Sequence, residues 1–213
     1  MKCGAQAERS SGIYASFKWA SVYKLFQFLI SRHENRSWLI SHHYRPKQGD
    51  RIVDIGCGPG TLASFLPVSC DLYGFDINPN YISDARRNYT GNFIVGNMGD
   101  FLDRYGDTLQ GTVDLVICCG VLHHVSIEEI DAILTGSKRL LRKEGRFVAI
   151  EPTFLERQDL LSKFFSLRDR GQSIFKDFQW AQHLNRHFEK TEIKVVNNLL
   201  RIPYVHVLLT GWK

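Results

Sequence analysis

The residues best suited to bind a cofactor form a glycine-rich loop, Gly56-Cys57-Gly58-Pro59-Gly60. The loop follows the β-branched run 51–55, which predicts a strand, and precedes residues 61–66, which predict a helix. Glycines at such a turn let the backbone bend tightly and approach a ligand with no side chain in the way. A strand, a glycine-rich loop and a helix in this order are typical of nucleotide-binding sites.

An acidic residue strengthens this interpretation. Asp76 ends the next predicted strand, 72–75, about twenty positions after Gly56. A carboxylate at that place can accept hydrogen bonds from both hydroxyls of a ribose. Taken singly, the glycines could serve a purely structural turn and the Asp could cap a helix. Loop and acid together at this separation predict a ribose-containing cofactor.

The glycine spacing distinguishes between possible cofactors. A dinucleotide-binding loop has the pattern G-x-G-x-x-G, whose third glycine would stand where this chain has Thr61. The observed G-x-G-x-G resembles the first motif of the class I (Rossmann-like) S-adenosylmethionine-dependent methyltransferases. A nicotinamide-dependent oxidoreductase is therefore disfavoured.

The resemblance extends over most of the chain. Segment 113–125 resembles the family's fourth motif, and segment 140–146 its "LLKPGG" turn, with Lys143-Glu144 in place of Pro-Gly. Segment 95–98 matches the position that contacts adenine, where many relatives carry Asp and this chain carries Asn97, whose amide oxygen can still accept a hydrogen bond. The resemblance implies S-adenosylmethionine as the cofactor. The cofactor-binding residues that it implies are Asp54, Gly56, Cys57, Gly58, Asp76, Ile77, Asn97, Met98, Gly120 and Val121.

Three residues are candidates for catalysis. His123 and His124 follow the predicted fourth strand, and Glu151 ends the fifth, where ligands meet an open α/β sheet. An imidazole there can take a proton from a hydroxyl or amine near neutral pH. Alignment of the two reactants can supply about 7–11 kcal/mol, whereas a general base adds about 10² to 10⁴-fold. A base is therefore optional, and either histidine could instead pack against or cap the following helix.

The substrate pocket is expected between an N-terminal helical lid, residues 1–48, and a helical insertion at about 154–188. Its predicted residues are Tyr14, Tyr23, Arg168, Arg170 and Tyr204. Aromatic residues in these segments are more often core than recognition residues, and the arginines could simply pair with surface acids. The two ends of the chain resemble a bacterial subgroup that acts on small-molecule or sugar-related substrates.

The order of the predicted elements gives the fold class. Strands and helices alternate from residue 49 onward, which predicts βαβ units and a doubly wound, mostly parallel α/β sheet. Two further runs near the end, 192–196 and 205–209, predict an antiparallel pair at the edge of a seven-stranded sheet. A capping-box pattern, Ser126 with Glu129, predicts the start of a helix that ends at Leu141. We expect one methyltransferase domain over 49–213.

Composition limits the alternatives. The net charge of +5 is spread over separate segments, so nucleic acid is an unlikely substrate. The five cysteines show neither a C-x-x-C pair nor a zinc-binding spacing, and no metal is expected. No run is apolar enough for a signal peptide or a bilayer span, so we expect a cytoplasmic protein. The oligomeric state stays open.

These observations predict an enzyme that transfers a methyl group to an oxygen or nitrogen of a small molecule, sugar-related metabolites included. Two alternatives remain. The first is a nucleic-acid methyltransferase, although the Asn/Asp-Pro-Pro-aromatic sequence typical of base methylation is absent after the fourth strand, where Cys118-Cys119-Gly120-Val121 stands. The second is a non-catalytic partner protein that has kept the fold.

Overall fold

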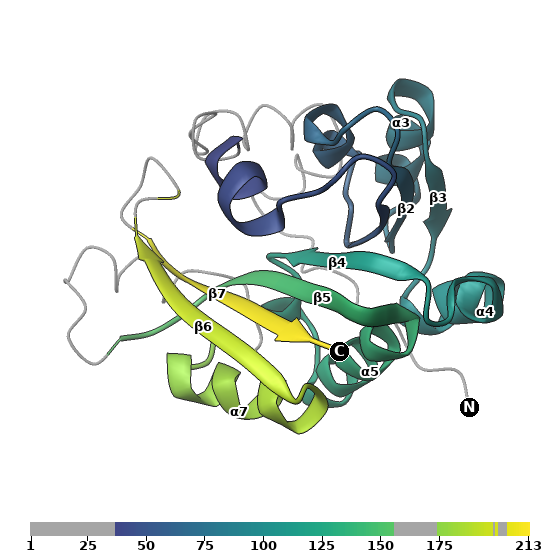
Figure 1. The fold of residues 1–213 in the computed structure, drawn as a ribbon. Coiled ribbons are helices and arrows are strands. Elements are labelled where there is room, and N and C mark those ends of the chain that lie inside the picture. Colours follow the sequence, from purple (N-terminus) through teal and green to yellow (C-terminus); the bar gives the residue numbers. More distant parts are fainter. Residues whose placement is uncertain (1–36, 156–173, 198, 200–203) are drawn as a thin grey trace.

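The computed structural model describes residues 37–155, 174–197, 199 and 204–213. In this part of the chain, seven strands form one sheet with helices on both faces (Figure 1). The strands are β1 (Arg51–Ile55), β2 (Asp71–Asp76), β3 (Asn92–Val95), β4 (Val113–Cys119), β5 (Leu141–Pro152), β6 (Lys190–Asn197) and β7 (Val205–Trp212). The helices are η2 (Ile40–Tyr44), η3 (Thr61–Phe65), α3 (Pro79–Asn88), α4 (Met98–Leu109), η4 (Leu122–His124), α5 (Ile127–Leu140) and α7 (Asp177–His187).

The strand order is β3-β2-β1-β4-β5-β7-β6. The first five strands are parallel, and β7 pairs antiparallel with both β5 and β6. The predicted mostly parallel sheet with an antiparallel C-terminal pair is confirmed. The chain leaves β1 toward β2 on one side and later enters β4 on the other. Ligands of open α/β sheets bind at the carboxyl ends of the strands where the order reverses in this way.

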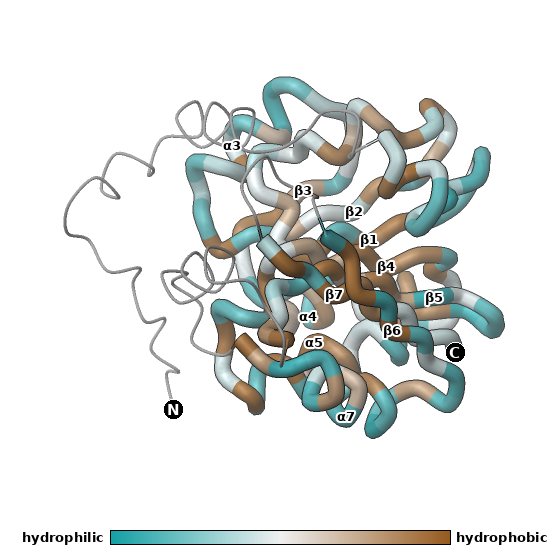
Figure 2. Tube along the Cα trace, turned by 90° about the vertical axis from the view of Figure 1, so that its left-hand side faces the viewer, coloured by the Kyte–Doolittle hydropathy of each residue, from teal (hydrophilic) through white to brown (hydrophobic). Residues whose placement is uncertain are grey.

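Each face of the sheet is buried against its own layer of helices. On one face, Phe147 packs with Phe101 of α4 and Trp180 of α7, all three fully buried. On the other, Ile52 and Tyr44 belong to a cluster that includes residues of α3, η3 and η2. Apolar residues run along the strands and polar residues along the outer turns (Figure 2). Burial on both faces explains the nearly continuous apolar sequence of β4.

Side-chain caps fix where two of the helices begin. The capping box predicted for α5 is confirmed, since the Ser126 hydroxyl accepts from the backbone N–H of Glu129 and the Glu129 carboxylate accepts from that of Ser126. Asn97 and Asp100 form a second box at the start of α4. This second box was not predicted, and it explains why α4 begins at Met98.

Other boundaries also differ from the sequence-based expectation. Residues 61–65 form a tight 3₁₀ helix, and β7 extends beyond the expected 205–209. Of the expected helical insertion, only α7 is helical within the described residues. Lys176, just before α7, instead forms a β-bridge with Phe154. Most of the predicted lid, and the centre of the insertion, lie outside the described residues.

An irregularity in β5 lies where the sequence departs from the "LLKPGG" turn. Its pairing with β4 skips from Leu141 to Arg146, so the residues between them bulge out. Within the bulge, Glu144 has a φ of 66°, in the left-handed region that favours glycine. This is the position where the family's "LLKPGG" turn has its first glycine, so Glu144 holds the conformation at some cost in strain.

Candidate functional site

The glycine loop joins β1 to η3 and turns through three left-handed residues. Gly56, Gly58 and Gly60 have φ values of 65°, 53° and 77°. A Cβ atom on Gly56 would lie 2.4 Å from Cγ2 of Val121, in the loop that follows β4. Gly56 is therefore required both by its backbone conformation and by the close approach of the β4 loop.

Asp76 is held against this loop by two backbone hydrogen bonds. Its Oδ2 accepts from the N–H of Gly58 at 3.0 Å, and its Oδ1 accepts from the N–H of Asn78 at 2.8 Å. Each carboxylate oxygen can accept more than one hydrogen bond, so these contacts fix the orientation of the group and remain compatible with ribose hydroxyls. The sequence predicted Asp76 and the loop as partners, and the structure brings them into direct contact.

Asp54 is a second acidic residue beside the loop and is the penultimate residue of β1. Its exposed fraction is 6%. Burial, and then the negative charge of Asp76, raise the pKa of Asp54 to about 8. At neutral pH this carboxyl therefore carries a proton in the free protein, and a cation bound nearby would favour its ionised form.

Three more of the predicted cofactor-binding residues follow β2 and β3. Ile77, directly after Asp76, is 70% exposed, which makes it an apolar surface available to a flat ring. Asn97 is exposed and its side-chain oxygen accepts from the N–H of Asp100 at 3.1 Å, so an adenine amino group would share that oxygen. Met98 is buried, and only its backbone is suited to the predicted contact.

The loop after β4 carries the predicted catalytic histidines. It begins at Gly120, whose φ is 67°, and continues through Val121 into η4. His123 is buried and His124 is exposed, and their ring centroids lie 3.9 Å apart. His123 Nδ1 lies 2.6 Å from Oε2 of Glu151 at the end of β5. The structure thus brings the three predicted catalytic residues together.

Glu151 is oriented inward. Its exposed fraction is zero, and its carboxylate accepts hydrogen bonds from the backbone N–H groups of Val121, Leu122 and His123. The geometry therefore supports a role in holding the β4 loop. A role as a group that touches the substrate is not supported by this placement.

Tyr44 is a site residue that the sequence analysis missed. It ends η2, is 4% exposed and lies beside Cys119 at the end of β4. Burial raises the pKa of Tyr44 well above its usual range, and the neighbouring Cys119 and Asp54 raise it further. The only signal in the sequence was its position at the end of the N-terminal helical segment.

Of the five predicted substrate residues, Tyr204 lies within the described part of the chain. Tyr14, Tyr23, Arg168 and Arg170 lie outside the described residues. Tyr204 is buried, and its ring centroid lies 5.0 Å from that of His206, which pairs with the last residue of β5. Tyr204 therefore lies close to the carboxyl edge of the sheet.

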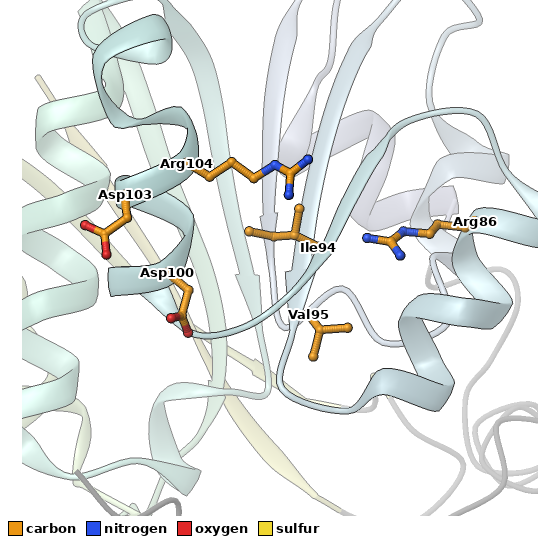
Figure 3. A pocket seen from close by; sticks show the side chains of 6 residues that line it. All are labelled: Arg86, Ile94, Val95, Asp100, Asp103 and Arg104. Carbon is orange, nitrogen blue, oxygen red and sulfur yellow. The ribbon is translucent and has the colours of Figure 1, made fainter. Parts of the chain in front are cut away.

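A separate hollow of about 520 Å³ lies at the β3 edge of the sheet, between α3 and α4. The side chains of Arg86 and Arg104 extend toward each other across Ile94 (Figure 3). The Arg86 guanidinium donates to the backbone oxygen of Phe93 through Nε at 2.9 Å and Nη2 at 2.6 Å. Arg86 thereby protects the outer edge of the strand.

The described residues contain neither a metal-binding cluster nor a membrane-spanning helix. They contain no cluster of three or more His, Cys, Asp or Glu side chains arranged to hold a metal ion. None of the helices in that part of the chain has the length and apolar character needed to span a bilayer.

The chain is similar in sequence to known methyltransferases. Residues 52–145 match the family model of the methyltransferase domain. Magnesium-protoporphyrin O-methyltransferase from Synechocystis sp. is 32% identical over 100 residues, which cover 46% of this chain and 43% of that protein. Thiol S-methyltransferase from Homo sapiens is 31% identical over 107 residues, which cover 47% of this chain and 41% of that protein. The match thus spans less than half the length of these curated relatives.

The fold comparison covers more of the chain. The crystal structure of an S-adenosylmethionine-dependent methyltransferase from Archaeoglobus fulgidus aligns with a TM-score of 0.68 and 16% identity. The alignment covers 90% of this chain and 99% of that chain. The region matched by the family model contains the glycine loop, Asp76 and the β4 loop. Residues 52–145 thus match the methyltransferase domain in sequence, and the described residues have the Rossmann-like fold of methyltransferases.

Proposed function

We propose that this protein transfers a methyl group from S-adenosylmethionine to an oxygen or nitrogen atom of a small molecule, with sugar-related metabolites as the first class of acceptor to test. The observation that carries the proposal is the Asp76 carboxylate, held by the N–H groups of Gly58 and Asn78 beside three left-handed glycines. This arrangement suits an unphosphorylated ribose, because a carboxylate beside a ribose phosphate would repel it.

The chain's own residues fit the rest of the cofactor. The exposed Ile77 offers an apolar contact for adenine, and Asp54 lies where a carboxyl group can face a cation. Bound S-adenosylmethionine supplies a methyl group already activated on a sulfonium. The main task of the protein is then to align the acceptor for in-line displacement, and a general base is an addition to that task. His124, which is exposed beside His123, is the imidazole best able to meet an acceptor.

The names of the two curated relatives support a small-molecule acceptor, since one methylates a porphyrin and the other a thiol. Because the positive charge is dispersed, we predict that nucleic acid is not the methyl acceptor. Binding of single-stranded RNA at physiological salt in a gel-shift assay would contradict it.

The experiment that tests the proposal is isothermal titration of the full chain with S-adenosylmethionine, S-adenosylhomocysteine and NAD, each separately. We expect selective binding of the first two. Selective binding of NAD would overturn the interpretation of the glycine loop, and binding of none would favour the non-catalytic alternative. Acceptor screening with sugars and hydroxylated metabolites follows from the expected result.

A matched pair of variants localises the binding. Asp76→Ala removes both acceptor oxygens and should weaken S-adenosylhomocysteine binding at least tenfold, because hydrogen bonds to charged groups contribute about 1.5–3 kcal/mol. Asp107→Ala, a fully exposed acid on α4, should leave the affinity unchanged. Equal affinities of the two variants would show that Asp76 does not hold the ribose.

A further inference from the structure

The Glu151 carboxylate is the most completely engaged acidic group near the site. It is fully buried, and Oε1 accepts from the N–H of Val121 at 3.1 Å and of Leu122 at 2.9 Å. Oε2 lies 3.3 Å from the N–H of His123 and 2.6 Å from its ring Nδ1. One side chain of β5 thus binds three consecutive backbone groups and the imidazole of the same loop.

These contacts determine the chemical form of the pair. Both oxygens of the Glu151 side chain already accept from backbone N–H groups. We therefore interpret the short contact as a hydrogen bond in which Nδ1–H of His123 donates to Oε2. In a neutral imidazole with a proton on Nδ1, the lone pair resides on Nε2.

The same contacts determine the position of the loop. The N–H of Gly120 donates to the backbone oxygen of Ile150 at 2.8 Å, which adds a second attachment to β5. Val121, held by Glu151, fills the space above Gly56 in the cofactor loop. A change at Glu151 would therefore reach the glycine loop through Val121, although Glu151 itself is inaccessible to any ligand.

We propose that Glu151 is a positioning residue that anchors the β4 loop against the cofactor loop and holds His123 with its proton on Nδ1. Neither the anchoring nor the tautomer depends on the function proposed above. No role in touching the substrate is assigned to Glu151.

The decisive measurement is long-range ¹⁵N–¹H correlation spectroscopy of the full chain labelled with ¹⁵N-histidine, with the His123 signals assigned from their loss in His123→Gln. We expect wild-type His123 to show the neutral Nδ1–H form near neutral pH, with a far-downfield Nδ1 proton. An Nε2–H form in the wild type would overturn the proposal without any need for a Glu151 variant.

Glu151→Gln tests the coupling. Its amide can donate as well as accept, so we expect His123 to lose the Nδ1–H preference, and S-adenosylhomocysteine affinity to fall about tenfold or more. The matched control is Glu128→Gln, an exposed acid in the first turn of α5, which should change neither readout. A folded Glu151→Gln protein with the wild-type tautomer and affinity would refute the proposal.

The two proposals fail in different ways. If the wild type binds neither S-adenosylmethionine nor S-adenosylhomocysteine, the proposed function fails, but the His123 tautomer is still measured. If it binds both and His123 carries its proton on Nε2, the proposed function stands and the role of Glu151 is wrong.

Discussion

Replacing Asp54 by Asn should stabilise the cofactor-free protein, and the gain should grow as the pH rises from about 4.5 to about 8. Burial and the charge of Asp76 raise the pKa of Asp54 from its ordinary 3.8 to about 8. Between these two values the unfolded chain has released the proton and the folded chain retains it. The free energy of unfolding of the wild type therefore falls with rising pH, and it levels off above about 8.

The structure limits the size of this effect. A rise from 3.8 to about 8 corresponds to at most about 6 kcal/mol, at about 1.4 kcal/mol for each tenfold change in the equilibrium. Local relaxation and entering water reduce such penalties, so we expect a measured difference of about 2 kcal/mol between the two ends of the range. Asn has a similar size and cannot ionise, so its pH profile isolates the contribution of the carboxyl group.

Urea unfolding of the wild type and Asp54→Asn across this pH range is the assay, with Asp107→Asn as an exposed control. A difference between wild type and Asp54→Asn that does not change with pH would refute the reasoning. A second assay uses the cofactor. At pH 7 the Asp54 carboxyl, with a pKa of about 8, is about nine-tenths protonated. Binding of the cationic S-adenosylmethionine should therefore release nearly one proton. Titrations in buffers of different ionisation enthalpy should show this release in the wild type and lose it in Asp54→Asn.

Three further predictions concern the turns and caps around the site. Gly56→Ala should lower the free energy of unfolding by about 1–3 kcal/mol and weaken cofactor binding, because its methyl group would lie 2.4 Å from Val121 Cγ2. Adding Val121→Ala to this variant should recover part of both losses. If Gly56→Ala alone caused no loss, the contact would be contradicted. In urea unfolding, Glu144→Gly should raise the free energy of unfolding by about 0.5–1 kcal/mol, because φ is 66° at this residue. The control Lys143→Gly should lower it by a similar amount, because φ is not positive there. Ser126→Ala should lower the free energy of unfolding by about 1 kcal/mol, because α5 loses its N-terminal cap. An unchanged thermal midpoint would show that the cap contributes little.

The elements that the sequence predicted well are those with a local physical cause. The buried strands are short, mostly apolar runs, and α5 begins at a Ser followed three residues later by a Glu. The order of strands and helices was enough to predict the parallel sheet and its antiparallel edge. The sequence also identified Asp76 as the partner of the glycine loop, because the separation of the two follows from one strand, one turn and the next strand.

The elements that it missed depend on tertiary contacts. Asn97 was interpreted only as an adenine contact, so its capping box with Asp100, and the full length of α4, were not recognised. Tyr44 reaches the site only because η2 packs over the same face of the sheet as Ile117. The substrate residues predicted on the lid and the insertion remain predictions, since most of them lie outside the described residues.

Residue type and strand position identified Glu151 as a site residue, but they did not show whether its role is catalysis or positioning. An acid at the carboxyl end of β5 lies where catalytic acids of such sheets lie, and sequence alone cannot tell whether it faces the cleft or the core. The strand order decides this, because β4 and β5 are neighbours and the loop leaving β4 crosses the end of β5. The carboxylate then meets backbone N–H groups that would otherwise be buried without partners. The same adjacency of β1 and β4 brings Val121 onto Gly56, so one buried acid on a third strand controls how the histidine loop meets the cofactor loop.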